Sequence, residues 1–339
     1  MNNYGYDNSL SAQLELTSNC TNNCNHCYNG YGNNNNSPTF KIENIKKLIS
    51  NLLLKGIHYL QITGGEPMLY PEILMMLLEN CASNGIVCGI NSNLTVLTPD
   101  IIKTIRECNV EINTSIHSWN HLLHDKIAGN QGAFIKTKQN IKLLKEVGAP
   151  VNVNMVVMKS NCSDVYQTGL FAKSLGIDSF SAGKVVPSVY SNNFNELKLD
   201  SDQVVTMIEA LILLKEKDGM LTEVSSILPA CIIESPERFK EILLNKPCSA
   251  GKTMCAISAD GSVKPCIREP NSFGNIFIDD LSVIWDRWES WKDDSLLPQL
   301  CKDCLYLTKC GGGCRLDCAY NGDICSYDPY AIHKSNFGR

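Results

Sequence analysis

Three cysteines near the N-terminus are spaced like the ligands of an iron–sulfur cluster. The segment TSNCTNNCNHCY places Cys20, Cys24 and Cys27 at C-x3-C-x2-C, directly after a predicted strand over 13–17. Three thiolates on one loop can hold three irons of a [4Fe–4S] cube, which leaves the fourth iron open for a substrate or cofactor. Structural zinc sites normally have four protein ligands, and His26 adjoins Cys27 too closely to be an unstrained fourth. The loop therefore favours an iron–sulfur cluster over zinc.

A second group of cysteines lies toward the C-terminus. Its members are Cys248, Cys255, Cys266, Cys301, Cys304, Cys310, Cys314, Cys318 and Cys325. The total of seventeen cysteines is odd and the polar N-terminal segment has no secretory signal, so disulfides do not explain them. Clustered thiolates in a reducing compartment most often bind metal. Spacing alone leaves a zinc ribbon and iron–sulfur clusters both open.

Composition and charge exclude several classes of protein. The length of 339 residues suits one large α/β domain and a smaller module. A net charge of -5 gives no basic footprint, so nucleic acid is not an expected partner. No apolar run approaches the ~20 residues of a membrane-spanning helix, so no membrane association is expected. Together with the missing secretory signal, these features predict a cytoplasmic protein.

Short β-like runs alternate with helix-like patterns through the first half of the chain. The predicted strands are 13–17, 58–63, 86–91, 111–116, 151–158 and 178–183. The predicted helices are 41–55, 73–85, 100–108, 134–148 and 163–175. Six such units predict an α/β fold, a partial (β/α)6 TIM-like barrel of parallel strands, two units short of a closed barrel.

The composition and the periodicity of the sequence change twice after the predicted barrel. We expect the barrel to occupy 1–195, followed by a helical bridge at 196–245 with an extended stretch at 220–228. A cysteine-rich module follows at 246–339, where periodicity weakens. Parallel β/α sheets carry their chemistry at the strand C-termini, which is where the first cysteine loop falls.

A glycine pair follows the second predicted strand, in TGGEP (63–67). Together with CTNNCNHC, this motif resembles the radical S-adenosylmethionine (radical SAM) enzymes. The resemblance implies a [4Fe–4S] cluster on the three cysteines, whose open iron binds SAM. It also implies that Gly64 and Gly65 lie beside the methionine amino group, with Glu66 nearby.

Further segments extend the resemblance over roughly 12–185. NSNLTVL (91–97) resembles a segment that follows the third strand, and TSIHS (114–118) resembles an SxD segment that contacts ribose, with His117 in place of aspartate. HDKIAGNQGAFIKTKQNI (124–141) resembles a third family stretch, although its arginine is missing. The resemblance thus places these residues at the cofactor: Gly64, Gly65, Glu66, His26, Ser92, Asn93 and Ser115.

The C-terminal spacing, with its flanking ISADGSVKPC and GNIFIDDLSVIW, resembles the SPASM domain of radical SAM enzymes. That resemblance implies two auxiliary [4Fe–4S] clusters. The expected ligands of the first are Cys248, Cys266 and Cys314, with Cys255 as fourth. The expected ligands of the second are Cys301, Cys304 and Cys310, with Cys325 favoured over Cys318 as fourth. Without Cys255, one iron of the first auxiliary cluster would be open to a substrate thiolate.

The other cysteines carry no clear chemistry. Cys81, Cys88 and Cys108 fall in predicted helices or a strand, where cysteine is commonly a small buried hydrophobe. Cys231 and Cys318 are expected near the barrel mouth, as candidate hydrogen donors to a substrate radical. No catalytic residue can be assigned beyond these two candidates.

The resemblance implies reductive cleavage of SAM to a 5′-deoxyadenosyl radical, which abstracts hydrogen from a peptide. The leading hypothesis is maturation of a ribosomally made peptide by a thioether (sactionine) or carbon–carbon crosslink, or by epimerisation. Alternatives are an anaerobic sulfatase-maturing enzyme and a small-molecule radical dehydrogenase; PCIREPNSFGN also resembles haem-maturation proteins. A non-catalytic iron–sulfur or zinc scaffold is the alternative from another class. Expected partners are the precursor peptide, a separate peptide-recognition protein, and flavodoxin or ferredoxin as electron donor.

Overall fold

The computed structural model describes residues 9–31, 38–188, 190, 193–233, 236–243, 247–293 and 295–331. The first eight residues of the predicted barrel and the last eight of the predicted C-terminal module lie outside this range. All seventeen cysteines are described, and all are free thiols.

One curved sheet of ten strands forms the centre of the molecule, in the order β10-β9-β8-β1-β2-β3-β4-β5-β6-β7. Every neighbouring pair from β8 to β7 is parallel, whereas β8, β9 and β10 pair antiparallel. The strands are β1 Leu10–Glu15, β2 Ile57–Thr63, β3 Val87–Asn91, β4 Glu111–Ser115, β5 Val151–Val157, β6 Ser179–Lys184, β7 Thr222–Val224, β8 Met254–Ile257, β9 Ser262–Lys264 and β10 Gly274–Asn275. The predicted partial barrel of parallel strands is confirmed.

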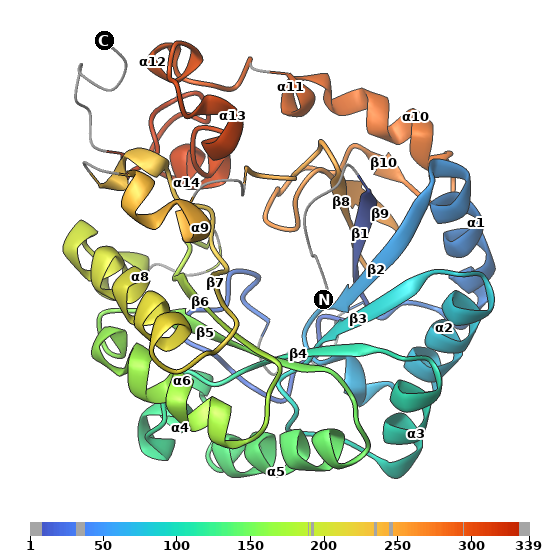
Figure 1. Cartoon of the computed structure of the whole chain (residues 1–339). Helices are drawn as coiled ribbons and strands as arrows, with labels where there is room; N and C mark the ends of the chain where they lie inside the picture. Colours follow the sequence, from blue (N-terminus) through green and yellow to red (C-terminus); the bar gives the residue numbers. More distant parts are fainter. Residues whose placement is uncertain are drawn as a thin grey trace.

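Helices surround the outer face of this sheet, and short helices of the C-terminal region lie at one end of it (Figure 1). The barrel helices are α1 Ile45–Lys55, α2 Pro71–Ser83, α3 Pro99–Glu107, α4 His121–Ala128, α5 Ala133–Glu146, α6 Val165–Ser174, α7 Phe194–Leu197, α8 Ser201–Glu216 and α9 Lys240–Leu243. The C-terminal helices are α10 Leu281–Trp285, α11 Glu289–Lys292, α12 Gln299–Lys302, α13 Leu307–Cys310 and α14 Arg315–Tyr320.

Alternation along the strands separates an apolar outer face from a polar inner face. In β5, Val153 and Met155 are fully buried in the core, while Asn152 and Asn154 lie on the opposite face. There the Asn154 side chain accepts a hydrogen bond from Ser181 of the next strand, with an oxygen–oxygen distance of 3.0 Å. Such cross-strand bonds satisfy polar groups inside the barrel and hold the register.

Two further parallel strands, β7 and β8, extend the sheet beyond the six predicted units. The extended stretch predicted at 220–228 contains β7, which adds to β6. At the other edge, Ser11–Leu14 of β1 pairs with Met254–Ile257 of β8, so the cysteine-rich region shares the barrel's own sheet. The strand β8 covers an edge of β1 that would otherwise expose unpaired backbone groups.

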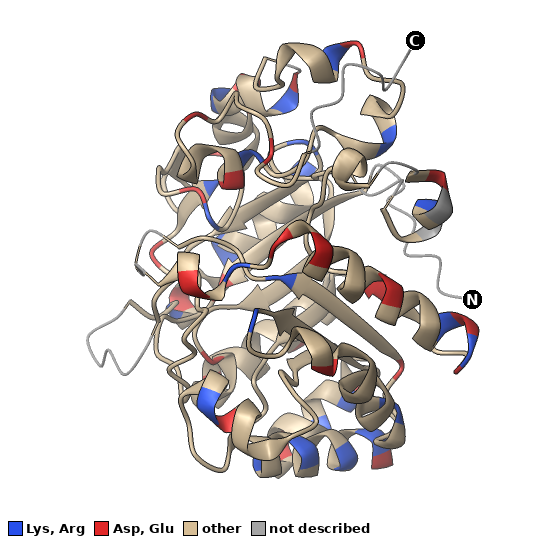
Figure 2. Cartoon of the chain, turned by 90° about the vertical axis from the view of Figure 1, so that its left-hand side faces the viewer, with Lys and Arg blue, Asp and Glu red and all other residues tan. Residues whose placement is uncertain are grey.

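Acidic and basic residues are interspersed on the face shown in Figure 2, in keeping with the small net charge. Within the described part of the chain, no helix is long and apolar enough to cross a membrane.

Candidate active site

The loop that carries Cys20, Cys24 and Cys27 leaves the C-terminal end of β1 and docks on the end of α4. The backbone nitrogen of Asn23 donates to the carbonyl oxygen of Ala128 over 2.9 Å. Gly129, in the left-handed conformation with φ 60°, ends α4, and a Cβ there would collide with the Asn23 carbonyl oxygen. The cysteine loop is therefore held in place by backbone contacts with a helix more than a hundred residues away.

The three thiols of this loop form an electrostatically coupled group. Burial, with a contribution from Cys27, raises the pKa of Cys20 to about 11. Burial, with contributions from Cys27 and Cys20, raises the pKa of Cys24 to about 12. A bound metal centre is one means of stabilising crowded, buried thiols of this kind as thiolates. The donor set therefore fits a three-thiolate iron–sulfur cluster.

The glycine pair after β2 permits a close backbone approach to the same loop. Gly65 N donates to the carbonyl oxygen of Thr17 over 2.6 Å, and Glu66 N donates to that of Asn19 over 2.7 Å. A Cβ on Gly64 would collide with the Thr17 carbonyl oxygen, and one on Gly65 with that of Asn19. Both glycines are thus required to join the strand end to the cysteine loop.

Glu66 joins this segment to the end of β3. Its carboxylate accepts hydrogen bonds from Ser92 Oγ over 2.7 Å and from the backbone nitrogens of Asn93 and Met68 over 2.8 and 3.1 Å. The side chain is fully buried, and burial raises its pKa to about 7. The Asn93 amide in turn lies 3.6 Å from Cys20 Sγ. The structure therefore brings Glu66, Ser92, Asn93 and Cys20 into one connected group.

Three histidines meet beside Cys24, on the side of β4. The rings of His26 and His117 meet edge to face with centroids 4.6 Å apart, and His117 stacks on His124 at 5.5 Å. Burial lowers the pKa of His26 to about 4, and that of His117 lies well below its usual value for the same reason. One ligand atom each from Cys24, His26 and His117 lies within 4.8 Å of the others. Ser115 ends β4 nearby in sequence and is half-buried. His124 begins the segment 124–141, and the sequence alone does not assign it a role.

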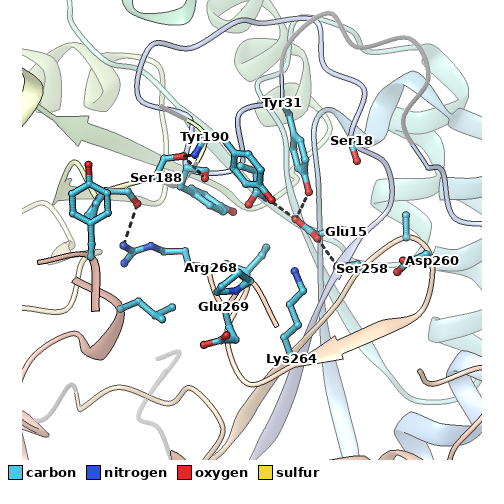
Figure 3. Close-up of a pocket in the computed structure, with 18 of the residues that line it drawn as sticks. Glu15, Ser18, Tyr31, Ser188, Tyr190, Ser258, Asp260, Lys264, Arg268 and Glu269 are labelled. Atoms are coloured by element: carbon cyan, nitrogen blue, oxygen red, sulfur yellow. Dashed lines mark hydrogen bonds between the residues drawn. The ribbon is translucent and has the colours of Figure 1, made fainter. Parts of the chain in front are cut away.

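A cavity of about 440 Å³ lies between the cysteine loop, the segment after β6 and the start of the C-terminal region (Figure 3). Its aromatic walls come from Tyr28, Tyr31, Tyr190 and Tyr320. Glu15, at the end of β1, accepts hydrogen bonds from Tyr31 over 2.9 Å and from Ser258 over 3.0 Å. Sequence reasoning did not select these residues, because they come from segments far apart in the chain and match no motif.

Three of the four thiols predicted for the first auxiliary cluster, Cys248, Cys266 and Cys314, lie near Arg268, which lines this cavity. Burial raises the pKa of Cys266 to about 12, with contributions from Cys248 and Cys314. Burial also raises the pKa of Cys314 to about 11, with contributions from Asp317 and Cys248. Cys255 is fully buried in the core on β8, and the charge that acts on it is that of Lys55 on α1. Ligation by Cys255 stays a prediction.

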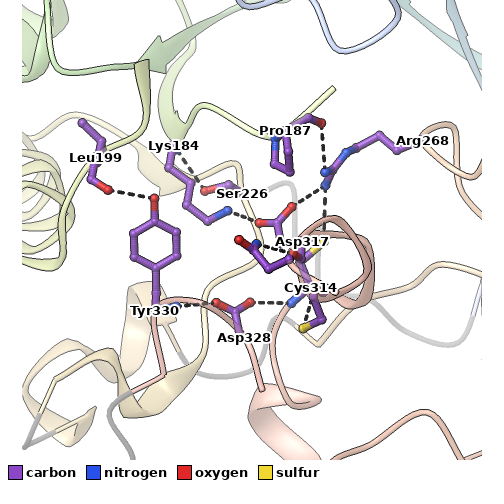
Figure 4. Close-up of polar contacts among 11 residues, drawn as sticks. Lys184, Pro187, Leu199, Ser226, Arg268, Cys314, Asp317, Asp328 and Tyr330 are labelled. Atoms are coloured by element: carbon purple, nitrogen blue, oxygen red, sulfur yellow. Dashed lines mark hydrogen bonds and ion pairs between the residues drawn. The ribbon is translucent and has the colours of Figure 1, made fainter. Parts of the chain in front are cut away.

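A buried ion network lies against Cys314 (Figure 4). Arg268 Nη1 lies 2.8 Å from Asp317 Oδ1 and donates to Cys314 Sγ over 3.4 Å, while Nη2 donates to the Pro187 carbonyl oxygen over 3.2 Å. Lys184, at the end of β6, forms an ion pair with the other oxygen of Asp317. Burial would raise the pKa of Asp317, but the charges of Lys184 and Arg268 hold it below its usual value. The network ties barrel strand β6 to α14.

Three of the four thiols predicted for the second auxiliary cluster line a separate pocket. Cys301, Cys304 and Cys310 line it, and so does Cys231. Cys325 is exposed, with its Sγ 3.9 Å from the Ser295 carbonyl oxygen. Cys318 is fully buried and donates to the Cys314 carbonyl oxygen within α14.

Neither Cys231 nor Cys318 is among the described residues that line the 440 Å³ cavity, which gives no support to their predicted role as hydrogen donors there.

The CGGGC turn has positive φ at all three glycines, 66°, 76° and 85°, which only glycine adopts readily in succession.

The fold is a partial parallel barrel with a three-thiol loop at its strand ends and further groups of thiols in its C-terminal region. These features are typical of an iron–sulfur enzyme that binds a cofactor at the barrel mouth. Comparison with known families specifies this class. The sequence matches the Radical SAM superfamily over residues 14–169 and the SPASM iron–sulfur cluster-binding domain over residues 248–305. The chain belongs to the radical SAM enzymes with a C-terminal SPASM domain. Its cofactors are a [4Fe–4S] cluster, S-adenosylmethionine and auxiliary iron–sulfur clusters.

Curated relatives span most of the chain. It is 26% identical to the AdoMet-dependent heme synthase of Methanosarcina barkeri, over 94% of this chain and 95% of that protein. It is also 26% identical to the antilisterial bacteriocin subtilosin biosynthesis protein AlbA of Bacillus subtilis, over 94% and 71%. The crystal structure of Streptococcus suis SuiB bound to precursor peptide SuiA superposes with a TM-score of 0.76 at 18% identity, over 96% and 76% of the two chains. That likeness shows the shared fold.

Proposed function

We propose that this enzyme abstracts a carbon-bound hydrogen from a peptide and thereby takes part in the maturation of a ribosomally made peptide. The observation that carries the proposal is the cavity between the cysteine loop and Cys314. Tyr28 follows directly on Cys27 and Tyr31 lies three residues beyond Tyr28, while Arg268 lines the same cavity and donates to Cys314. A substrate held there would touch both the radical-generating loop and an auxiliary cluster site.

The lining of the cavity suits a peptide better than a carboxylate-rich tetrapyrrole. Tyrosines supply rigid surfaces that accept side chains, and Ser188 and Asn29 can bond to amide groups. Its titratable carboxylates are Glu15, Asp260 and Glu269, against Lys264 and Arg268, and Arg268 is already paired with Asp317. Haem retains two carboxylates, which this acidic lining would repel.

The relatives give the proposal its direction. AlbA is named for bacteriocin biosynthesis, and SuiB was crystallised with a precursor peptide. The product could be a thioether, a carbon–carbon crosslink or an epimerised residue. The alternatives are haem formation, which a relative of equal identity performs, sulfatase maturation and small-molecule dehydrogenation.

In this proposal Cys20, Cys24 and Cys27 hold the first cluster. When bound, the cluster and SAM supply the radical that removes hydrogen from the substrate. Glu66 fixes the glycine pair and Asn93 around Cys20, while the tyrosines and Glu15 position the substrate and exclude water. His26, Ser92 and Ser115 keep their predicted place near SAM.

The expected partners follow from this chemistry. The enzyme needs an electron donor such as flavodoxin or ferredoxin, and a separate recognition protein could present the precursor. Seventeen free thiols suit a reducing compartment, so we place the enzyme in the cytoplasm.

The test uses the anaerobically reconstituted enzyme with SAM and dithionite. Synthetic peptides from reading frames beside its gene are assayed for a mass change and for 5′-deoxyadenosine. Cys24→Ala is the inactive control. A peptide that changes mass and raises 5′-deoxyadenosine formation at least tenfold supports the proposal. Stoichiometric binding of haemin that is lost in Tyr31→Ala, with every peptide unchanged, would support haem chemistry instead.

A further inference from the structure

We propose that Cys231, from the segment between barrel and SPASM domain, is the fourth thiolate ligand of the cluster held by Cys301, Cys304 and Cys310. The inference rests on the auxiliary clusters of the SPASM domain and not on the identity of the substrate. It replaces the prediction that Cys325 completes this site.

The first three thiols converge on one pocket from two short helices and their connection. Cys301 lies on α12, Cys304 two residues beyond its end, and Cys310 at the end of α13. All three thiols line the same pocket. Thiols gathered around one pocket have the chemistry of a shared metal centre.

The segment that carries Cys231 is fixed directly against these thiols. Cys231 lies in the single-turn helix η4 (Ala230–Ile232). The backbone nitrogen of Ala230 donates to Cys310 Sγ over 3.2 Å. Ala230 and Cys310 are both buried and pack with Tyr306 in a small apolar cluster of their own. An N–H group donated to a ligand sulfur is the contact expected beside an iron–sulfur cluster.

Cys231 itself forms part of the wall of the pocket. The other wall residues include Pro229, Leu307 and Tyr327, which give it an apolar, water-poor surface. Four thiols around one apolar pocket match the number of ligands that a [4Fe–4S] cube takes. Asp328 also lines the pocket, but its two carboxylate oxygens already accept hydrogen bonds from the backbone nitrogens of Cys314 and Tyr330.

The two cysteines that sequence reasoning considered lie elsewhere. Cys325 is exposed and is not among the described residues lining the pocket, and its Sγ faces the Ser295 carbonyl oxygen. Cys318 is buried within α14 and donates to its own helix. The loop around Cys325 is fixed by Arg315 Nη1, which donates to the carbonyl oxygens of Ile324 and Ser326 over 3.2 and 3.0 Å.

Ligation by Cys231 would give this cluster a structural role in the barrel. The segment from β7 to η4 leaves the edge strand of the sheet, and β7 is the last strand in the order. A cluster that binds Cys231 would cross-link this edge to the SPASM helices, some seventy residues farther along the chain. Metal binding would then stabilise the packing of the two regions against each other.

The decisive test uses differential alkylation of the unmutated full-length enzyme, so no variant has to fold. Cluster-loaded and cluster-free protein are each treated briefly with iodoacetamide under anaerobic conditions, and each cysteine is quantified by peptide mass spectrometry. We expect loading to slow modification of Cys231 at least tenfold, together with Cys301, Cys304 and Cys310. Cys325 should react at the same rate in both forms. Buried Cys162 is the control for general tightening of the fold.

Equal reactivity of Cys231 in the two forms overturns the proposal, as does protection of Cys325 in its place. A second measurement counts iron in a Cys24→Ala background, where two auxiliary clusters correspond to about eight irons per chain. Cys231→Ala should lower the count toward about four or change the cluster's EPR spectrum, and Cys325→Ala should do neither. The reverse pattern also overturns it. If both variants lose iron, the alkylation result decides.

Discussion

Arg268 donates a hydrogen bond from Nη1 to Cys314 Sγ over 3.4 Å, so a guanidinium charge lies directly on a predicted cluster ligand. Asp317 and the Pro187 carbonyl oxygen hold the guanidinium in that position. A positive donor beside a cluster sulfur favours the reduced, more negative state of the cluster, because charge and hydrogen bonds to sulfur set its potential. Arg268 also lines the proposed substrate cavity. Arg268 therefore lies between the predicted cluster site and the proposed substrate cavity.

Arg268→Gln should lower the reduction potential of the cluster that Cys314 ligates. If the interaction favours the reduced state by about 1.4 kcal/mol, the fall is about 59 mV for one electron. An EPR-monitored redox titration in a Cys24→Ala background measures it. Arg106→Gln, an exposed change on α3, should leave the potential unchanged. An unchanged or higher potential in Arg268→Gln contradicts the assignment.

Gly65→Ala should displace the cysteine loop, because the added Cβ collides with the Asn19 carbonyl oxygen. We expect 5′-deoxyadenosine formation to fall at least tenfold, with loss of iron from the first cluster. Gly148→Ala is the matched control: its φ of 79° adds backbone strain, but a Cβ there meets no atom within 4 Å. Equal activity in the two variants would show that the close approach is not needed.

Glu66→Gln should change how stability depends on pH. Burial raises the pKa of Glu66 to about 7 from a usual value near 4.5, so the folded state holds this proton more tightly than the unfolded state. Its stabilising contribution is full below about pH 4.5 and is lost as the pH rises through 7, by up to about 3 kcal/mol.

The stability advantage of the unmutated enzyme over Glu66→Gln should therefore shrink as the pH rises from about 5.5 to about 8. Thermal unfolding of the anaerobic holoenzyme across this range measures the difference. Glu72→Gln, at an exposed position in the first turn of α2, should show no such trend. A difference that grows with pH contradicts the argument.

Lys184→Met should destabilise the contact between β6 and α14. The change leaves buried Asp317 with Arg268 as its remaining counter-charge, and breaking a buried pair from one side costs about 3–5 kcal/mol when no partner remains. With Arg268 still present we expect about 2–3 kcal/mol, measured by urea unfolding. Lys145→Met breaks a more exposed pair with Asp178 and should cost less than about 1 kcal/mol. Equal costs would show that the buried network adds no stability.

The parts that the sequence predicted well are those encoded locally. The six parallel strands are confirmed, and each depends on a short run of residues. The three-cysteine loop and the glycine pair are also encoded locally and lie together in the structure, while their roles at a cluster and at SAM stay predictions. Gly65 was selected by its motif, and the structure adds the reason, a backbone contact with Asn19. The extended stretch at 220–228 was also recognised, although not as a seventh strand of the sheet.

The parts that it missed depend on long-range packing. Arg268 meets Glu15 and Tyr31 at the cavity from a segment more than two hundred residues farther along the chain. The pairing of β8 with β1 could not be predicted locally. A strand of four residues, such as β8, could equally belong to a small sheet within the C-terminal module. The spacing of cysteines favours Cys325 as the fourth ligand, and that stays a prediction; it gives no sign that the fold brings Cys231 to the pocket from outside the cysteine-rich region.

The most direct test of the proposed function follows the abstracted hydrogen atom. A substrate peptide deuterated at its carbon positions is incubated anaerobically with the reconstituted enzyme, SAM and dithionite, and 5′-deoxyadenosine is analysed by mass spectrometry. The account predicts that 5′-deoxyadenosine gains deuterium in step with modification of the peptide, and that Cys24→Ala abolishes both. Deuterium-free 5′-deoxyadenosine, formed at the same rate with and without peptide, would contradict it.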